Sequence, residues 1–423
     1  ADRRAQQGRG RDDVIQGVRE RSAVTASISV PLRGSDAAGE FAALLNGLAA
    51  LPASVSGTAG QDRHPANAPA ASALPARASL SQALHYLIVR ARPYTSVTLL
   101  SPPKMIAAAR AAPRSAQPPA SSGVGASVSA SKAGQPLSLQ DYPRPPADNG
   151  RGIHWIPTTR QAREVVDRFV AQVQTLGMRW VTFLNEAGDL NGNEYLVRRL
   201  VSAGIMPIMR IYTEGGAAIQ GDVTALVQRY RRLGVSYYQL FNEPNLRVEN
   251  QGQAPDVSRY LSLWLPAARQ VVAAGGLPGF GALSPQGDVN DLDFLRRALE
   301  GLKARDAEDV LNRMWISVHN YGKDHLRVRE YDKIVREVMG RSLPLIGTEA
   351  GLYAEGGISE EEQVRMVTEA YRYLSQREPY YFAYSYWVLA NQAGGGHDPR
   401  WEYQALYRAD GPTPLAQALE QPA

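Results

Sequence analysis

The stretch Leu240–Asn245 reads Leu-Phe-Asn-Glu-Pro-Asn, and in it an apolar run gives way to polar residues. The run itself, Tyr237–Phe241, has the length and the apolar, aromatic character of a buried strand. An amide and a carboxylate, Asn242 and Glu243, follow it directly. The pattern therefore predicts a strand whose carboxyl end carries a hydrogen-bonding group beside an acid.

The same alternation continues in both directions from this stretch, over residues 151–423. Short apolar runs alternate with longer segments of helical period, and eight such pairs fit within these residues. This is the pattern of an α/β fold of the (β/α)8 type, a TIM barrel, whose usual length is about 250 residues. The predicted strands are Gly152–Ile156, Met178–Leu184, Met206–Tyr212, Tyr237–Phe241, Phe280–Leu283, Trp315–His319, Leu343–Gly347 and Tyr381–Val388.

An open, doubly wound sheet is the alternative for such a pattern. It would usually have fewer strands, and a nucleotide-binding version would carry a glycine-rich turn after its first strand. Here that turn is Pro157–Thr159, and neither the dinucleotide motif nor a phosphate-binding P-loop occurs. The barrel is therefore the preferred prediction.

Residues 1–150 have a different character. They carry 16 Lys and Arg against 9 Asp and Glu, whereas the rest of the chain carries 30 against 32. The net charge of +5 thus arises in this region and is poor evidence for binding to nucleic acid. We expect a poorly ordered N-terminal leader rich in Ala, Pro, Ser and Arg over residues 1–106, and an Ala/Pro/Ser-rich linker over 107–150, because such a composition buries little apolar surface.

Several classes of protein and site are disfavoured by what the chain lacks. The absence of cysteine excludes disulfides, thiolate metal sites and a cysteine nucleophile. No apolar run is long enough to span a membrane, and no apolar signal-peptide segment follows the N-terminal arginines. A metalloprotease-type His-Glu-x-x-His motif is also absent, so we expect no metal. The basic leader is expected to be a solvated tail, with contact to a cell wall as the minority alternative.

The residues at and after the ends of the predicted strands are mostly carboxylates, amides and aromatic rings. In a TIM barrel the active site lies at this end of the strands. Amides and carboxylates hydrogen-bond sugar hydroxyls, and aromatic faces stack on a pyranose ring, so the pattern predicts a carbohydrate site. The candidates are His154, Trp155, Asn185, Glu186, Asp189, Arg210, Tyr212, Glu214, Asn242, Glu243, Asn245, His319, Asn320, Tyr321, Glu349, Tyr353, Trp387, Asn391 and Gln392.

Two carboxylates stand out among these candidates. Glu243 ends the fourth strand, and Glu349 ends the seventh in the stretch Ile346–Gly351, which reads Ile-Gly-Thr-Glu-Ala-Gly. A carboxylate directly after a buried strand is partly desolvated, which raises its pKa as a general acid requires. A second carboxylate about 5–5.5 Å away can attack an anomeric carbon. We therefore predict that this pair is catalytic.

Asn-Glu-Pro after the fourth strand and a glutamate after the seventh resemble glycoside hydrolase clan A, the retaining TIM-barrel glycosidases that include families 5 and 39. The resemblance covers residues 151–423. It implies that Glu243 is the acid/base and Glu349 the nucleophile in a double displacement that cleaves β-glycosidic bonds. The implied partner is a carbohydrate, and no cofactor is required because two carboxylates and water suffice.

The resemblance also implies binding roles. Asn242 would bind the 2-hydroxyl, His319 would contact the sugar, Tyr321 would orient the nucleophile and Trp387 would be a platform under the sugar. Family 5 usually places an arginine near the end of the second strand, and this chain has none there. Arg210, at the end of the third strand, is expected to supply that charge or else to form a structural ion pair.

Three further residues are predicted to bind substrate. Asn185 and Glu186 form a second Asn-Glu pair after the second strand, where a binding or rim role is more usual than catalysis. Trp155 lies near the end of the first predicted strand and is expected either to face the sugar or to pack in the core. His397, in a glycine-rich stretch, is a weaker candidate for substrate contact.

The alternatives to a glycosidase are a carbohydrate-binding pseudoenzyme and a cell-surface attachment protein on the same scaffold. A transglycosylase differs from a hydrolase only in its acceptor, which the sequence does not decide. The sugar, its linkage, and endo or exo action also stay open. We expect an extracellular or cell-surface monomer.

Overall fold

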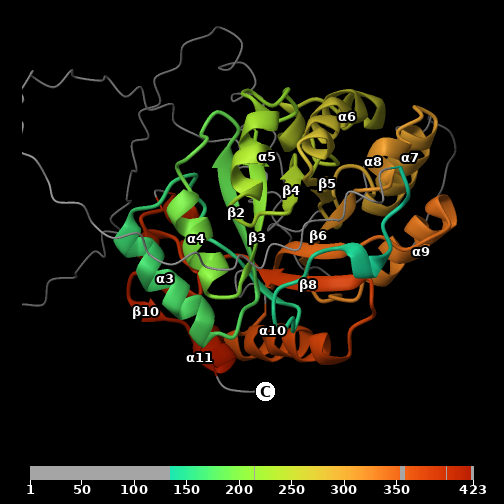
Figure 1. Cartoon of the computed structure of the whole chain (residues 1–423). Helices are drawn as coiled ribbons and strands as arrows, with labels where there is room; N and C mark the ends of the chain where they lie inside the picture. The colour runs from blue at the N-terminus through green and yellow to red at the C-terminus, as the bar shows by residue number, and fades with distance from the viewer. Residues whose placement is uncertain (1–133, 214, 353–357, 397, 421–423) are drawn as a thin grey trace, which may run out of the picture. The chain divides into compact units, whose positions relative to one another are not determined.

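The computed structural model describes residues 134–213, 215–352, 358–396 and 398–420, and in these residues eight parallel strands close into a barrel (Figure 1). The first strand completes the ring, since Ile153 pairs with Val181 on one side and with Tyr386 on the other. The prediction of a (β/α)8 barrel is confirmed. The strands are β1 (Arg151–His154), β2 (Trp180–Glu186), β3 (Met206–Tyr212), β4 (Tyr237–Leu240), β5 (Leu277–Leu283), β6 (Trp315–Tyr321), β7 (Leu345–Gly351) and β8 (Tyr381–Tyr386).

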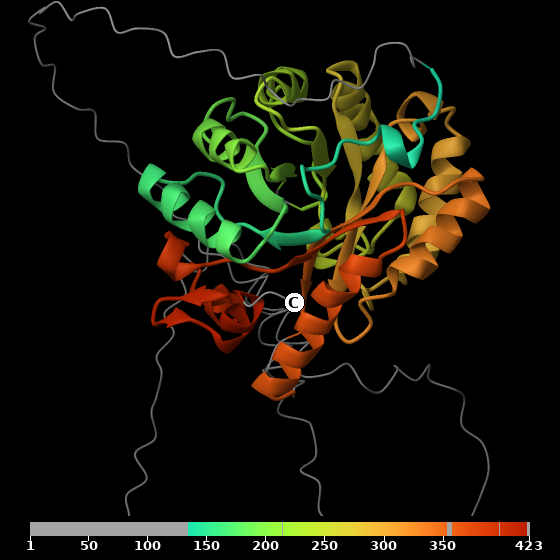
Figure 2. The same cartoon turned by 60° about the horizontal axis from the view of Figure 1, so that its bottom comes forward.

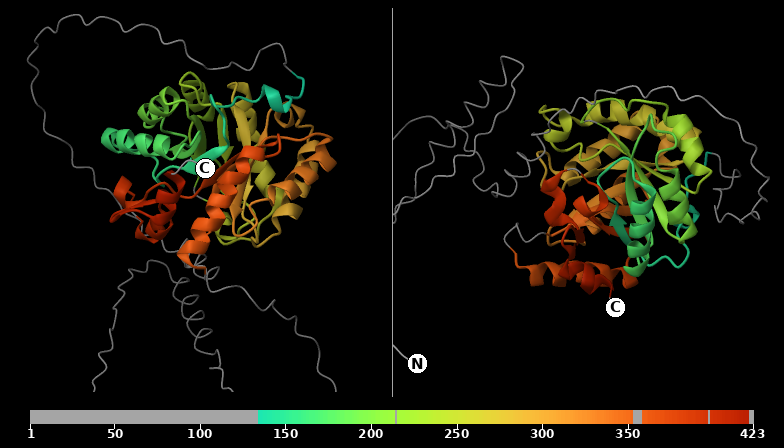
Figure 3. Two further views of the ribbon diagram at one scale, coloured as in Figure 1. Left: turned by 90° about the horizontal axis from the view of Figure 1, so that it is seen from below. Right: turned by 90° about the vertical axis from the view of Figure 1, so that its left-hand side faces the viewer.

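Helices cover the outside of this ring. In Figures 2 and 3 they follow one another around the strands, from α3 in green through α6 in yellow to α10 in orange. None of the helices in the described residues is both long and apolar enough to cross a membrane. Their bounds are α3 (Arg163–Thr175), α4 (Glu194–Ser202), α5 (Val223–Arg231), α6 (Val257–Ala273), α7 (Asp291–Lys303), α8 (Glu308–Leu311), α9 (Val328–Met339), α10 (Glu360–Tyr373) and α11 (Pro414–Glu420).

Each helix packs on the barrel through one apolar face. In α3, the residues Val166, Phe169, Val170 and Val173 are buried, which is the three-and-four spacing of a helix face. Side-chain caps fix several helix starts, as at α5, where Asp222 accepts a hydrogen bond from the backbone N–H of residue 225. The outer core between strands and helices therefore follows from amphipathic helices with defined beginnings.

Shorter elements complete the chain. A two-stranded antiparallel ribbon, β9 (Tyr407–Arg408) with β10 (Gly411–Pro412), precedes the last helix. Short 3-10 turns occur in the loops between the main elements. They are η2 (Leu139–Asp141), η3 (Val248–Asn250), η5 (Leu374–Gln376), η6 (Gln392–Gly394) and η7 (Pro399–Gln404).

A second, inner core fills the end of the barrel where the strands begin. Its members come from the first residues of the strands, and two residues from before β1, Leu137 and Tyr142, are buried against them. The hydroxyl of Tyr142 donates to the carbonyl of Met314 at 2.8 Å, which fixes the segment in place. The inner core comprises Trp180, Ile208, Tyr237, Leu277, Trp315, Ile346, Phe382 and Ala383, with Leu137 and Tyr142.

This packing concerns the segment predicted as a linker over residues 107–150. Its described part, residues 134–150, lies against the barrel rather than apart from it. Its composition is polar and proline-rich, but Leu137 and Tyr142 are buried against the aromatic end of the barrel and Leu139 packs there as well. Residues 1–133, including the predicted leader, lie outside the described residues.

The middle of the barrel is polar and tightly closed. Ser317 and Thr348 share a hydrogen bond of 2.7 Å between their hydroxyl oxygens, and both are fully buried. Gly347 directly precedes Thr348 on β7, beside this layer. A Cβ atom at this position would be 2.8 Å from the carbonyl oxygen of Ala383, so only glycine lets β7 approach β8 this closely. The open end of the barrel is consequently the end where the strands terminate.

Candidate active site

Glu243 and Glu349 are both at the open end of the barrel and both are buried. Glu349 lies on β7, whereas Glu243 follows β4 in a turn that leaves the strand abruptly. Phe241 and Glu243 have φ angles of 65° and 36°, so β4 ends one residue earlier than predicted. Non-glycine residues with positive φ cost of order 1–3 kcal/mol and occur most often at functional sites. The turn therefore holds the Glu243 carboxyl in place at a cost in backbone energy.

His319, on β6, lies between the two carboxyl groups. Its Nδ1 atom is 2.8 Å from Oε1 of Glu243, and its Nε2 atom is 3.6 Å from Oε2 of Glu349. Burial alone would lower the pKa of His319, but the charges of Glu349 and Glu243 outweigh burial, so the pKa is raised. One imidazole ring thus lies between the two predicted catalytic carboxyls, within hydrogen-bond distance of Glu243 and close enough to Glu349 for a charge interaction.

Glu349 is surrounded by groups that favour its charged form. Tyr321 donates a hydrogen bond of 2.7 Å to Oε2, and Arg210 forms an ion pair with Oε1. Burial raises the pKa of Glu349. His319, Arg210 and the tyrosine hydroxyl together lower it by a larger amount, so the net pKa is well below the ordinary range. Glu349 is therefore an ionised carboxylate at neutral pH, the state that a nucleophile needs.

Arg210 takes the place predicted for it at the end of the third strand. In the register of the sheet it lies beside Leu184 of β2, which is the strand on which family 5 would carry its arginine. Its guanidinium reaches across the barrel to Glu349. The charge beside this carboxylate thus comes from β3 instead of β2.

Trp387 directly follows β8 and is held at the same end of the barrel. Its backbone N–H donates to the carbonyl of Ala350 at 2.7 Å, and its ring lies 4.3 Å from that of His154. His154 is fully buried, and burial lowers its pKa to about 4 even though Glu349 opposes this. A neutral imidazole and an indole therefore lie together beside the charged cluster.

Asn242 is turned toward a residue that the sequence pattern did not single out. Its Nδ2 atom donates to Oε1 of Glu249, in the turn η3, at 3.2 Å. Burial and the nearby charge of Glu243 raise the pKa of Glu249 to about 7, although Arg210 and the Asn242 hydrogen bond oppose the rise. The only signal for Glu249 in the sequence is its place six residues after Glu243, in a loop with no strand or helix period.

Three predicted binding residues are not brought to this site. Trp155 is fully buried and packs edge-to-face on Phe169 of α3, at 6.4 Å between ring centroids, where no substrate can reach it. Asn185 is also fully buried and donates to the carbonyl of Asp189 at 3.0 Å. Glu186 is exposed at the rim. Side chains alternate along a strand, so residues next to each other at a strand end face opposite sides.

Other candidates from the sequence lie outside the described residues. They are Glu214, Tyr353 and His397. Within the described residues, no group of three or more His, Asp or Glu side chains could hold a metal ion.

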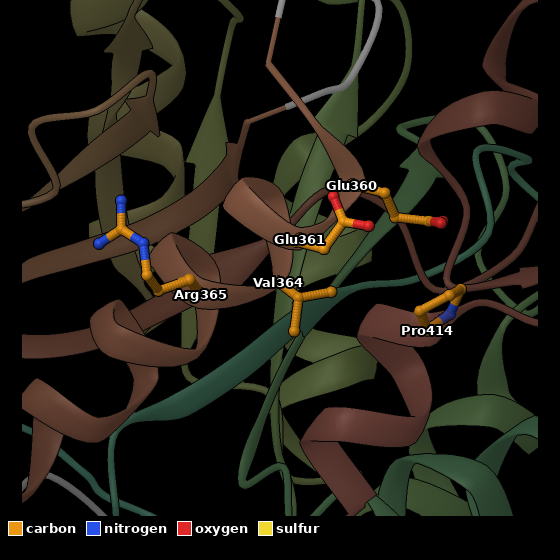
Figure 4. A pocket seen from close by; sticks show the side chains of 5 residues that line it. All are labelled: Glu360, Glu361, Val364, Arg365 and Pro414. Carbon is orange, nitrogen blue, oxygen red and sulfur yellow. The ribbon is translucent and has the colours of Figure 1, made fainter.

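A hollow on the outside of the barrel provides a comparison. It lies between the starts of α10 and α11, and Figure 4 shows Glu361 and Val364 between Arg365 and Pro414, with Glu360 alongside. Its arginine pairs with Glu369 at 3.7 Å, and both partners are well exposed. Its acids are exposed, unlike Glu243 and Glu349, so this hollow is a weaker candidate site than the strand ends.

Comparison with known proteins gives matches only among solved structures. No family model and no curated protein matches the chain. A GH128 subgroup II endo-β-1,3-glucanase from Sorangium cellulosum is 18% identical over 64% of this chain and 98% of its own, with a TM-score of 0.42. A family 39 glycoside hydrolase from Bacteroides cellulosilyticus WH2 is 15% identical over 66% of this chain and 63% of its own, with a TM-score of 0.45. A β-mannanase from Streptomyces thermolilacinus is 15% identical over 63% and 87%, with a TM-score of 0.40.

Proposed function

We propose that the chain is a retaining glycoside hydrolase, which cleaves β-glycosidic bonds of an oligo- or polysaccharide by double displacement. Glu349 is the nucleophile and Glu243 the acid/base. The observation that carries the proposal is the pairing of two buried carboxyl groups around His319, of which one is held ionised by Arg210 and Tyr321. This is the division of labour between two carboxyls that a double displacement requires.

In the first step, a carboxylate oxygen of Glu349 attacks the anomeric carbon. The bond from this carbon to the glycosidic oxygen breaks, and that oxygen takes the proton of Glu243 and leaves as an alcohol. Tyr321 and Arg210 bind different oxygens of Glu349. They therefore keep the carboxylate in one orientation while its negative charge passes into the ester.

In the second step, Glu243 acts in the reverse sense. It removes a proton from a water molecule, and the oxygen of that water attacks the anomeric carbon and displaces Glu349. Two inversions at one carbon give net retention. His319 keeps its hydrogen bond with Glu243 at 2.8 Å, which fixes the carboxyl in both of its roles.

The carbohydrate is bound by the groups around these two acids. Resemblance to clan A assigns the 2-hydroxyl to Asn242 and the sugar platform to Trp387. The proximity of Trp387 to His154 supports this assignment, because the indole then lies next to the charged cluster. Trp155, Asn185 and Glu186 have no part in the proposed site.

The test is the replacement Glu349→Ala, assayed on a panel of aryl β-glycosides and on β-linked polysaccharides. We expect turnover to fall by a factor of at least about 10⁴, because the covalent intermediate can no longer form. Added azide should restore turnover and give an α-glycosyl azide, since the small anion enters from the face that Glu349 occupied.

Glu360→Ala, which removes an exposed carboxyl from the outer hollow, is the matched control and should keep wild-type turnover. Wild-type turnover in Glu349→Ala would contradict the proposal. If the wild type binds sugar but cleaves neither aryl glycosides nor polysaccharides, the chain is a carbohydrate-binding pseudoenzyme.

A further inference from the structure

Glu249 lies on the short turn η3 (Val248–Asn250), and this turn is anchored without its help. Asn250 donates through Nδ2 to the carbonyl of Pro244 at 2.9 Å, and Arg259 of α6 donates to Oδ1 of Asn250 at 2.8 Å. The backbone of the turn is thus tied to the residue that follows Glu243. The Glu249 carboxyl is held at a fixed place in the site, but it does not itself hold the turn.

The Glu249 carboxyl instead accepts a hydrogen bond from the side chain of Asn242. Nδ2 of Asn242 donates one N–H to Oε1 of Glu249 at 3.2 Å. The other end of the amide, Oδ1, is buried and has no hydrogen-bond partner among the described residues. A primary amide carries two N–H groups, so the second one stays available to a ligand once the first is taken.

A glutamate at this place is costly. Glu243 and Glu349 both disfavour its negative charge, and of the charged groups that act on it most strongly only Arg210 favours it. No ion pair offsets the charge within the part of the chain that the structure describes. Local choices that cost stability occur mainly where function requires them.

We propose that Glu249 is a positioning residue, which fixes the side-chain amide of Asn242 so that its second N–H is directed to a substrate hydroxyl. The inference rests on the proposed function, because the hydroxyl is that of the sugar. Glu249 itself does not take part in bond breaking. Its effect on the reaction passes through Asn242.

The kinetic test is a double-mutant cycle with Glu249→Ala, Asn242→Ala and the double variant. We expect Glu249→Ala to lower kcat/KM about tenfold, the equivalent of one hydrogen bond, with most of the loss in kcat. In the Asn242→Ala background the same replacement should cost less than about twofold, because the residue through which it acts is gone. Glu249→Gln should stay within about threefold of wild type, since its amide oxygen also accepts the N–H.

Two kinetic results overturn the proposal. One is an equal loss from Glu249→Ala with and without Asn242, which would show a merely structural role. The other is a Glu249→Gln variant as impaired as Glu249→Ala. Glu300→Ala, an exposed carboxyl on α7, is the matched control and should match wild type.

A second measurement does not depend on activity. The side-chain amide signals of Asn242 in an amide NMR spectrum of the full chain can be assigned by their loss in Asn242→Ala. Glu249→Ala should shift both signals, and Glu300→Ala should leave them in place. Unchanged signals in Glu249→Ala overturn the positioning role, whereas shifted signals with no glycosidase activity in wild type leave that role standing and reject the proposed reaction alone.

Discussion

Glu349 shows how three neighbours can reverse the effect of burial on one carboxyl. Burial favours the neutral acid, yet His319, Arg210 and Tyr321 together hold the pKa of Glu349 below its ordinary range. A carboxyl with a depressed pKa contributes stability that is present above its unfolded pKa and is lost as the pH falls through its folded pKa. The same groups therefore extend, on the acidic side, the pH range over which Glu349 is ionised.

Replacement of Arg210 by Met should narrow the pH range over which Glu349 is ionised. Without the guanidinium the pKa of Glu349 rises, so the acidic limb of the kcat/KM profile should move to higher pH by about one unit or more. Arg210→Lys keeps a positive charge and should move the limb less. The measurement is kcat/KM against pH on one substrate.

The control for this prediction is Arg198→Met, which removes an exposed arginine of α4. Its pH profile should overlay that of wild type. If the acidic limb of Arg210→Met stays where it was, the arginine does not act on the nucleophile.

The sequence is most informative for residues directly after a buried strand. Glu243 and Glu349 were predicted on that ground and Tyr321 from the family resemblance, and all three lie around His319. Trp155 follows a strand equally closely, yet it faces the helices, because a shift of one position reverses the side of the sheet. Sequence periodicity could not set the strand ends to one residue, so it could not decide which of two neighbours faces the barrel.

At the scale of elements, several strand bounds differ from their predictions, among them the end of β4 and the start of β5. β4 ends at Leu240 because Phe241 adopts a positive φ that no pleated strand allows. β5 starts three residues before the predicted Phe280, although Pro278 and Gly279 are poor strand formers. Pairing with strands on both sides supplies what these two residues lack, and such tertiary effects are invisible to local propensity.

Gly347 links an element to the site. A side chain here would press on the carbonyl of Ala383 and separate β7 from β8, two residues before Glu349. We expect Gly347→Val to destabilise the fold by about 1–3 kcal/mol, as overpacking does, and to reduce kcat as the nucleophile shifts. Chemical denaturation and steady-state kinetics measure the two effects.

Gly188→Ala is the matched control, since a Cβ atom there meets no other atom within 4 Å. It should change neither stability nor kcat. A Gly347→Val variant with wild-type stability would show that β7 and β8 can separate at no cost.

At the scale of the molecule, the barrel is closed where its strands begin. Leu137 and Tyr142 cover the inner aromatic core, and Tyr237 donates to the carbonyl of Pro143 at 2.6 Å. A fragment of residues 151–423 lacks this cover and exposes large aromatic rings to water, whereas a fragment of residues 134–423 keeps it. We expect the shorter fragment to have the lower Tm, by several degrees, in a thermal unfolding experiment.

Tyr142→Ala in the longer fragment tests whether the buried ring itself supplies the stability that the shorter fragment lacks. It should reproduce a large part of the loss, because one buried ring supplies much of the cover. Equal Tm values for the two fragments would show that the barrel needs no cover.

The sequence predicted the barrel but set its beginning at residue 151. Eight repeats of strand and helix carry a strong periodic signal, and the segment that contains Leu137 and Tyr142 has no such signal. Leu137 and Tyr142 stand alone among polar and proline residues, so only their place in the folded molecule shows what they do.

Because the barrel is blocked at one end, everything that enters or leaves the proposed reaction uses the other. The alcohol released in the first step and the water needed for the second step therefore leave and enter at the same end of the barrel. Until the alcohol has diffused away, it competes with water for the glycosyl ester on Glu349. The concentration of acceptor sugar at this end of the barrel should therefore set the balance between hydrolysis and transfer of the sugar. A high concentration should favour transfer.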